Sequence, residues 1–174
     1  MARIIYKEGQ EGQNRLECIE GIEIELLNKQ KALIYPKYSE EIMLPLDKIA
    51  SWDAEDTTEI DALKKEGNLW ATGALLKCGS PAAEYVSNFR SDKFGIFGLP
   101  TLLAAMEIQK QQNDIDELSE IIEGADFLRN YTTCVWSYSR KDAFIGWTAN
   151  GDYGFSNGSC LYNPYLSVPV VLYR

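Results

Sequence analysis

Alternating apolar and polar residues near the N-terminus predict a β-hairpin over residues 18–36. Within residues 22–26, isoleucine or leucine alternates with glutamate, which is the period of a strand with one face toward water. The polar residues 28–31 are expected to form the turn, and residues 32–35 to run back as the second strand. Further along, Pro45 interrupts an apolar stretch, which indicates an edge strand or a loop there.

The middle of the chain shows the signals of helix starts and ends. Asp56 and Glu59 have the spacing of a capping box, and Gly67 is placed to end the helix that they begin. Ser80 followed by Pro81 predicts the start of a second helix, with serine as the N-cap and proline at the first helical position. A run of helices is therefore expected between the N-terminal hairpin and the last third of the chain.

Two more helical stretches follow. Thr101, after Leu99 and Pro100, is expected to cap a third helix. Residues 114–123 have apolar side chains at helical spacing, and Gly124 is the expected stop.

Beyond Gly124 the pattern changes to short strands separated by tight turns. Asn150-Gly151 and Asn157-Gly158 are dipeptides that favour hairpin turns. The expected strands are residues 134–138, 143–148, 153–156 and 168–173. Strands, then helices, then an antiparallel β meander predict an α+β fold. At 174 residues and 45% hydrophobic content, a single domain over 1–174 is expected.

The composition narrows the classes of partner. A net charge of -9 opposes binding to a phosphate backbone, so we expect no nucleic acid partner and no anionic membrane partner. The sequence has no apolar run of about 20 residues, so no membrane insertion is expected. The N-terminus lacks the apolar segment of a secretory signal, which favours a cytoplasmic or virion-associated protein over a Sec-exported one.

The residue types that could act in catalysis or bind a metal favour a protein that is not an enzyme. The chain contains no histidine and no closely spaced cysteine pair, so we expect no metal, no cofactor and no Cys–His nucleophile. Two interpretations of the cysteines stay open, namely free buried thiols or a bridge between Cys134 and Cys160. The remaining two cysteines are Cys18 and Cys78.

Two clusters of acidic residues are interpreted as solvated faces rather than as paired catalytic carboxylates, because their spacing follows the strand and helix periods. The clusters are Glu17, Glu20, Glu23 and Glu25, and Asp114, Asp116, Glu117, Glu120 and Glu123.

The order of several short motifs resembles a bacterial C-type-lectin-like family related to the C-terminal domain of collagen-like adhesins. The motifs are Leu99-Pro100-Thr101, Trp136-Ser137-Tyr138-Ser139 and Ser167-Val168-Pro169-Val170, with Leu44-Pro45-Leu46-Asp47 and Trp52 upstream. The resemblance covers residues 44–174 and implies a C-type-lectin-like fold there, with residues 1–43 as an N-terminal β-hairpin extension. It also implies that Trp136 lies in the core.

The chain departs from the family pattern where the family has arginine. Ile96-Phe97-Gly98 stands in place of Trp-Arg, and the closing motif has Ser167 and Val168 without arginine. If those arginines form a buried ion pair in the family, apolar packing replaces it here. The adhesin relatives are associated with polyanionic glycans, which the net charge of -9 disfavours as ligands of this chain.

The resemblance implies binding loops in the C-terminal meander, where aromatic and amide side chains suit sugar recognition. The candidate ligand-binding residues are Trp147, Asn150, Asp152, Tyr153, Asn157, Tyr162, Asn163 and Tyr165. The alternative is that asparagine serves the turns and the aromatic residues pack over the meander. The triplets that build a calcium-dependent sugar site in true C-type lectins are absent, so no calcium site is expected.

Two functional hypotheses follow. The first is a non-enzymatic binding module that presents an aromatic and asparagine-rich loop surface to a glycan or a protein. The second is a structural subunit of a larger assembly, such as a phage tail or a surface appendage, in which the same residues form contacts between copies or with neighbouring subunits.

Overall fold

The computed structural model describes most of the chain outside one long and several short segments. The described residues are 2–42, 73, 76, 80–130, 135–140, 145–150, 155–160 and 165–173. The expected helix at Asp56, together with Pro45 and the upstream motif that ends at Trp52, lies outside these residues.

The first sheet has four strands in the order β1-β2-β3-β11, all antiparallel. Its strands are β1 (Arg3–Tyr6), β2 (Ile19–Glu25), β3 (Lys31–Ile34) and β11 (Val170–Tyr173). The predicted hairpin is confirmed, because β2 pairs antiparallel with β3 and Ile22 lies opposite Ile34. The sheet also brings the first and last described strands together, which no local pattern predicted.

The second sheet has the order β4-β10-β7-β8-β9. Its strands are β4 (Ser39–Ile42), β10 (Tyr165–Ser167), β7 (Val135–Arg140), β8 (Ile145–Asn150) and β9 (Phe155–Cys160). The pair β10–β7 is parallel and the other pairs are antiparallel, which includes the meander of β7, β8 and β9. A short hairpin of β5 (Arg90–Ser91) and β6 (Gly95–Ile96) stands apart from both sheets.

Two of the predicted helix starts are confirmed. In α3 (Pro81–Ser87), the Ser80 hydroxyl accepts a hydrogen bond from the backbone N–H of Ala83. In α4 (Leu102–Lys110), the Thr101 hydroxyl accepts one from the N–H of Ala104. Each cap satisfies one of the free N–H groups at the start of a helix.

The third described helix, α5 (Gln112–Glu120), ends before the predicted residue 123. Glu123 instead pairs with the N-terminal loop, where its N–H donates to the Asn14 carbonyl at 2.8 Å. Gly124 follows with a φ of 87°, a conformation that glycine adopts without strain. A contact with a distant segment therefore sets the end of this helical stretch.

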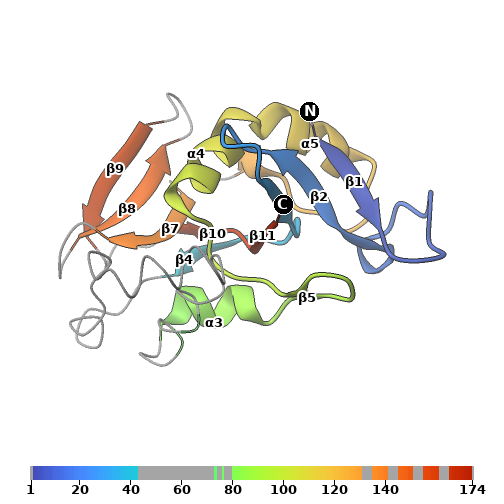
Figure 1. The fold of residues 1–174 in the computed structure, drawn as a ribbon, viewed down its shortest axis with the longest axis horizontal. Coiled ribbons are helices and arrows are strands. Elements are labelled where there is room, and N and C mark those ends of the chain that lie inside the picture. The colour runs from blue at the N-terminus through green and yellow to red at the C-terminus, as the bar shows by residue number, and fades with distance from the viewer. Residues whose placement is uncertain are drawn as a thin grey trace.

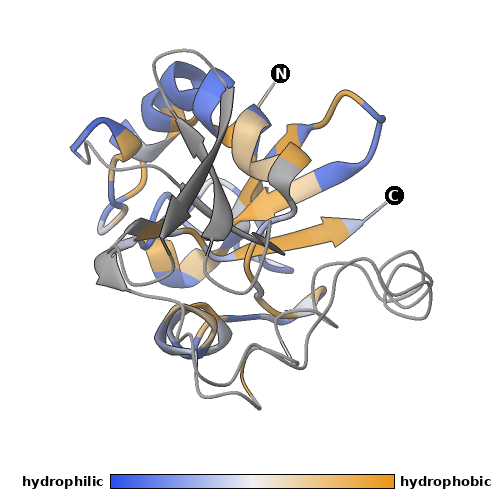
Figure 2. Cartoon of the chain, turned by 90° about the vertical axis from the view of Figure 1, so that its left-hand side faces the viewer, coloured by the Kyte–Doolittle hydropathy of each residue, from blue (hydrophilic) through white to orange (hydrophobic). Residues whose placement is uncertain are grey.

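The elements form an elongated arrangement. Figure 1 shows β8 and β9 at one end of the long axis and β1 and β2 toward the other, with α4 and α5 on one side and α3 on the opposite side. Figure 2 shows hydrophobic residues concentrated on the strands near the C-terminus. The main core joins β2, α4, α5 and the segment before β11, through residues that include Ile22, Ile108, Ile115 and Val168.

The prediction that one face of the N-terminal hairpin is exposed to water is wrong. Glu23 lies opposite Leu33 on the neighbouring strand, and Leu33 packs with Phe97 and Val171 in a second apolar cluster. Side chains from distant parts of the chain therefore cover the face that the alternation assigned to water. Glu23 is 7% exposed and Glu20 is 3% exposed.

The interpretation of the second acidic cluster as a solvated face is also wrong at Asp116, which is buried. The Asp116 carboxylate accepts hydrogen bonds from the N–H groups of Leu128 and Arg129, in the short helical turn η2 (Leu128–Asn130).

The predicted turn at Asn157-Gly158 is wrong as well, because both residues lie inside β9. The predicted third strand of the meander, residues 153–156, is therefore too early in the chain, because β9 spans Phe155–Cys160.

Buried Glu23 is compensated by three polar partners. The guanidinium Nε of Arg3 lies 2.7 Å from Oε1, the ammonium of Lys31 lies 3.4 Å from Oε1, and the Tyr173 hydroxyl donates to Oε2. Burial alone would raise the pKa of Glu23, but these partners together lower it below its usual range. Burial and the hydrogen bond to Glu23 raise the pKa of Tyr173.

We expect Glu23→Gln to lower the free energy of unfolding by about 1–3 kcal/mol at neutral pH, because the ionised carboxylate organises these partners. Since the pKa of Glu23 is lower in the folded state, its contribution is present above the unfolded pKa of about 4.3 and is lost as pH falls through the folded pKa. Urea unfolding at neutral and acidic pH measures this. The variant should show a shallower loss of stability in acid.

Glu25→Gln is the matched control, because Glu25 is the exposed acid at the end of the same strand. It should change the free energy of unfolding by less than about 0.5 kcal/mol. Equal effects of the two substitutions would show that the Glu23 network does not stabilise the fold.

Candidate functional site

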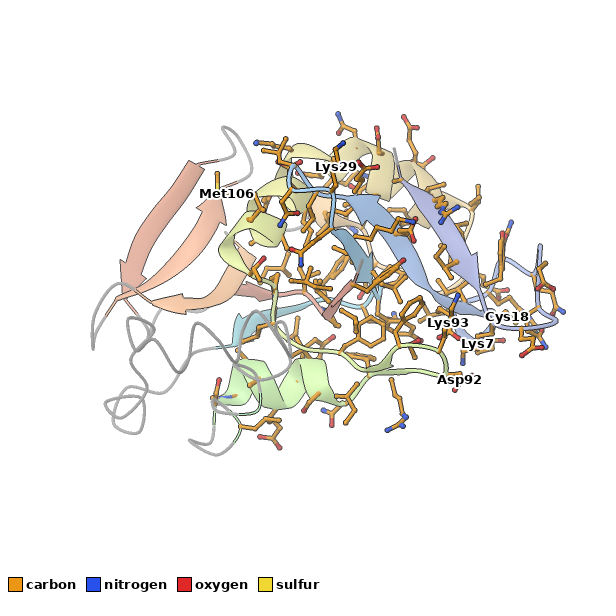
Figure 3. The ribbon with its side chains drawn as sticks, viewed as in Figure 1. Lys7, Cys18, Lys29, Asp92, Lys93 and Met106 are labelled. Carbon is orange, nitrogen blue, oxygen red and sulfur yellow. The ribbon has the colours of Figure 1, made fainter. Side chains whose placement is uncertain are left out.

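An open pocket of about 960 Å³ lies at the end of the molecule that carries β1 and β2. Its walls come from the loop between these strands, from the start of β2 and from the tip of the β5–β6 hairpin. Figure 3 shows Lys7, Cys18, Asp92 and Lys93 gathered at this end. The volume is at the upper end of the range usual for ligand pockets.

Two tight turns shape the loop that forms one wall. Gly9 and Gly12 have φ values of 74° and 79°, in the left-handed region that glycine tolerates. The N–H of Gln10 donates to the Lys7 carbonyl at 3.0 Å, and the N–H of Lys7 donates to the Cys18 carbonyl at 3.0 Å. The loop thus leaves β1, turns twice and returns through the short helical turn η1 (Leu16–Cys18) into β2.

The same loop is fastened to the end of α5 and to β1. The N–H of Leu16 donates to the Glu123 carbonyl at 3.1 Å, next to the bond between Glu123 and Asn14. The Tyr6 hydroxyl donates to the Asn14 side-chain oxygen at 2.6 Å. This wall of the pocket is therefore held by contacts at both of its ends.

The opposite wall is the turn between β5 and β6. The Ser91 hydroxyl accepts hydrogen bonds from the N–H groups of Phe94 at 2.8 Å and Lys93 at 3.2 Å, which fixes the turn. The N–H of Asp92 donates to Oε2 of Glu20 at 2.9 Å. Glu20 thereby joins β2 to the hairpin and lies at the junction of the two walls.

The pocket is charged, with more acids than bases. Five acidic residues and three basic residues line it. The bases have partners within the protein: Lys7 lies 3.7 Å from Asp92, and Arg15 lies 3.4 Å from Glu17. The ammonium of Lys93 lies 5.2 Å from the centre of the Phe94 ring.

The sequence patterns do not predict this pocket. The strand period places Glu17 and Glu20 on a solvated face, and it predicts no element in the loop of residues 7–15. The glycines at positions 9 and 12 were the available signal of a structured loop. The hairpin tip that forms the other wall lies far from Glu20 in the sequence, since Asp92 is 72 residues further along the chain.

Of the eight predicted ligand-binding residues, the structure describes the backbone of four. Trp147 and Asn150 lie on β8, Asn157 lies on β9, and Tyr165 begins β10. The other four lie outside the described residues, namely Asp152, Tyr153, Tyr162 and Asn163.

The strand register separates these four positions. Position 147 lies opposite Gly158, whereas position 157 lies opposite Thr148, and position 150 lies opposite Phe155. Since successive positions of a strand alternate between the two faces of a sheet, positions 150 and 157 share one face and position 147 belongs to the other. Tyr165 is set apart from β8 by β7.

Cys18 is a free, buried thiol, which confirms the free-thiol interpretation for this cysteine. No group of three or more metal-ligating side chains converges within the described part of the chain. Cys78 and Cys134 lie outside the described residues, so the bridge between Cys134 and Cys160 stays a hypothesis.

Within the described ranges, no helix combines the length and the apolar character needed to cross a membrane. No family model matches the sequence, and comparisons with curated proteins and with solved structures found no match. The residues of the chain and their geometry are therefore the basis for a functional proposal.

Proposed function

We propose that this chain is a non-enzymatic binding module with a C-type-lectin-like fold, which presents the surface around β8 and β9 to a glycan or a protein. The observation that supports a binding surface there is the meander itself. The strands β7, β8 and β9 form a continuous antiparallel ladder whose last member is β9. Among the described residues, no strand pairs with the outer side of β9.

The assignment to the lectin-like fold is supported by the way its motifs meet. The N–H of Gly98 donates to the Val170 carbonyl at 2.9 Å, and the N–H of Val170 donates back at 2.8 Å. The segment that leads into Leu99-Pro100-Thr101 is thus bonded to the closing motif that ends at Val170. The third motif, from Trp136 to Ser139, lies on β7, which pairs with β10 just before that closing motif.

At the two places where the chain departs from the family pattern, apolar side chains pack in the interior. Phe97, in the segment where the family has Trp-Arg, is fully buried against Leu33 and Val171. Val168, in the closing motif, is fully buried in the main core. This supports the interpretation that hydrophobic packing takes the place of charged residues at these positions.

The absence of histidine from the sequence supports a function without acid–base catalysis. Two of the buried acids have structural partners with positive charge or a hydroxyl group: Glu23 binds Arg3 and Tyr173, and Glu107 binds Lys110 at 3.0 Å. Carboxylates held in this way organise the fold rather than a reaction centre.

Binding of the purified protein to a broad glycan array, with and without calcium, tests the proposal. We expect selective, calcium-independent binding that falls about tenfold or more in the Trp147→Ala/Tyr162→Ala variant, because aromatic anchors dominate such surfaces. Leu27→Ala is the control, since Leu27 is an exposed apolar residue in the turn between β2 and β3. Equal loss in both variants would contradict a binding face around β8 and β9.

The outer side of β9, which pairs with no strand among the described residues, also favours a second candidate function, a structural subunit of a larger assembly such as a phage tail or surface appendage. Edge strands offer unpaired N–H and C=O groups to another chain. A blank glycan array together with concentration-dependent oligomerisation in sedimentation would favour the subunit. A strictly monomeric protein that binds glycans would favour the binding module.

A further inference from the structure

We propose that the pocket between the loop of residues 7–15 and the β5–β6 hairpin binds an extended organic cation, whose ammonium or guanidinium group pairs with Glu20. This site is separate from the surface around β8 and β9. Figures 1 and 3 show the two regions at opposite ends of the long axis.

The first support is the state of the Glu20 carboxylate. Glu20 is only 3% exposed and lines the pocket. Oε2 accepts the hydrogen bond from the N–H of Asp92, but no cation of the described residues lies within ion-pair distance of Glu20. The Glu20 carboxylate therefore lines the pocket with one hydrogen bond from the backbone and no cationic partner among the described residues, and a cationic ligand would provide that partner.

The second support is the balance of charge around Glu20. The three bases of the pocket are engaged with Asp92, with Glu17 and with the Phe94 ring. By contrast, Glu8 and Glu11 are exposed on the loop and make no ion pair with any described residue. The charges left without a partner are therefore negative, and their field attracts cations.

The third support is the size of the pocket, which distinguishes an organic cation from a metal ion. A volume of about 960 Å³ far exceeds the space of one hard cation with its ligands. The described residues also provide no convergent set of three metal ligands. A chain of several atoms with two or more positive groups would reach from Glu20 to the acids of the loop.

Two sources share this chemistry, a free polyamine and a lysine- or arginine-containing peptide segment. Isothermal titration with spermidine and with a short peptide of alternating lysine and glycine distinguishes them. We expect saturable binding by at least one of the two, weakened by salt, with backbone amide shifts at Asp92 and Lys93 in NMR spectra. The same peptide with acetylated lysines should not bind.

The decisive variant is Glu20→Gln, which keeps the acceptor oxygen for Asp92 and removes only the charge. We expect it to weaken binding about tenfold or more. Glu117→Gln changes the net charge equally at an exposed position on α5 and should leave affinity within about twofold. If Glu20→Gln unfolds the protein, the Glu8→Gln/Glu11→Gln variant on the exposed loop takes its place, again with weaker binding expected.

Failure of both cations to bind would overturn the proposal. So would equal weakening by Glu20→Gln and Glu117→Gln, which would mean general attraction to an acidic protein. These outcomes are independent of the glycan array, because neither acid lies on β8 or β9.

Discussion

Gly21→Ala is expected to lower the free energy of unfolding by about 3–5 kcal/mol, which is a large fraction of the stability of a domain of this size. Gly21 lies in β2 with a φ of 155°, a backbone conformation that residues other than glycine rarely adopt. An added Cβ would lie 2.6 Å from the Ile34 carbonyl oxygen and 2.9 Å from Cγ of Leu33. Both distances are shorter than an unstrained contact. The strain of the backbone conformation and the steric overlap of the added Cβ therefore both destabilise the folded state.

The neighbours of Gly21 have no room to move away. Ile34 is fully buried and is paired on both sides, with Ile22 of β2 and with Val170 of β11. Leu33 is fully buried in the cluster with Phe97 and Val171. Relief of the overlap therefore requires a shift of the central strands or of the second apolar cluster, and dense interiors resist such shifts.

Gly12→Ala separates the effect of backbone conformation from the effect of overlap. Gly12 also has a positive φ, 79°, but an added Cβ there meets nothing within 4 Å. We expect this control to lower the free energy of unfolding by about 1–2 kcal/mol, measured in urea beside Gly21→Ala. If the two substitutions prove equally costly, the close approach of β2 and β3 does not determine the effect.

The elements that the sequence predicted well depend on contacts between near neighbours. Ser80 and Thr101 each accept a hydrogen bond from an N–H three residues ahead, so the cap can be recognised from a few letters. The hairpin of residues 18–36 was equally visible, because its two strands adjoin in sequence and pair directly.

The elements that the sequence did not predict depend on distant partners. β1 and β4 are short, and each is specified by a partner strand elsewhere in the chain, as in the pairing of Tyr165 with Ile42. Local alternation predicts that Glu23 faces water, because Tyr173, which hydrogen-bonds to it, and Phe97, which packs with the opposite residue Leu33, lie far along the chain. Local alternation reports the period of a strand, but it does not report what covers the strand.

The two candidate sites also differ in how far the sequence predicts them. Residue types alone predict the C-terminal surface, whereas the strand register places position 147 on the face opposite positions 150 and 157. The pocket beside Glu20 was invisible in the sequence, because it forms only where the hairpin tip at Asp92 meets the N-terminal loop.

Asp116→Ala is expected to lower the free energy of unfolding by about 2–4 kcal/mol. The Asp116 carboxylate accepts hydrogen bonds from Leu128 at 2.7 Å and from Arg129 at 2.9 Å, so it joins α5 to the short turn η2. Asp116 and Leu128 are both buried, and truncation would leave the N–H groups that the carboxylate binds without acceptors. Removing the acceptor from a buried, charge-assisted pair of hydrogen bonds has effects of this size.

Asp114→Ala provides the matched control, because Asp114 is the exposed aspartate in the first turn of the same helix. Its loss removes a favourable interaction with the helix dipole, worth about 0.3–1 kcal/mol. Urea unfolding of both variants measures the difference, and Asp116→Asn adds a further comparison, since it keeps one acceptor oxygen and should fall between them. An Asp116→Ala variant as stable as Asp114→Ala would show that the junction of α5 and η2 forms without the carboxylate, and that the apolar contacts of Leu128 alone hold the turn in place.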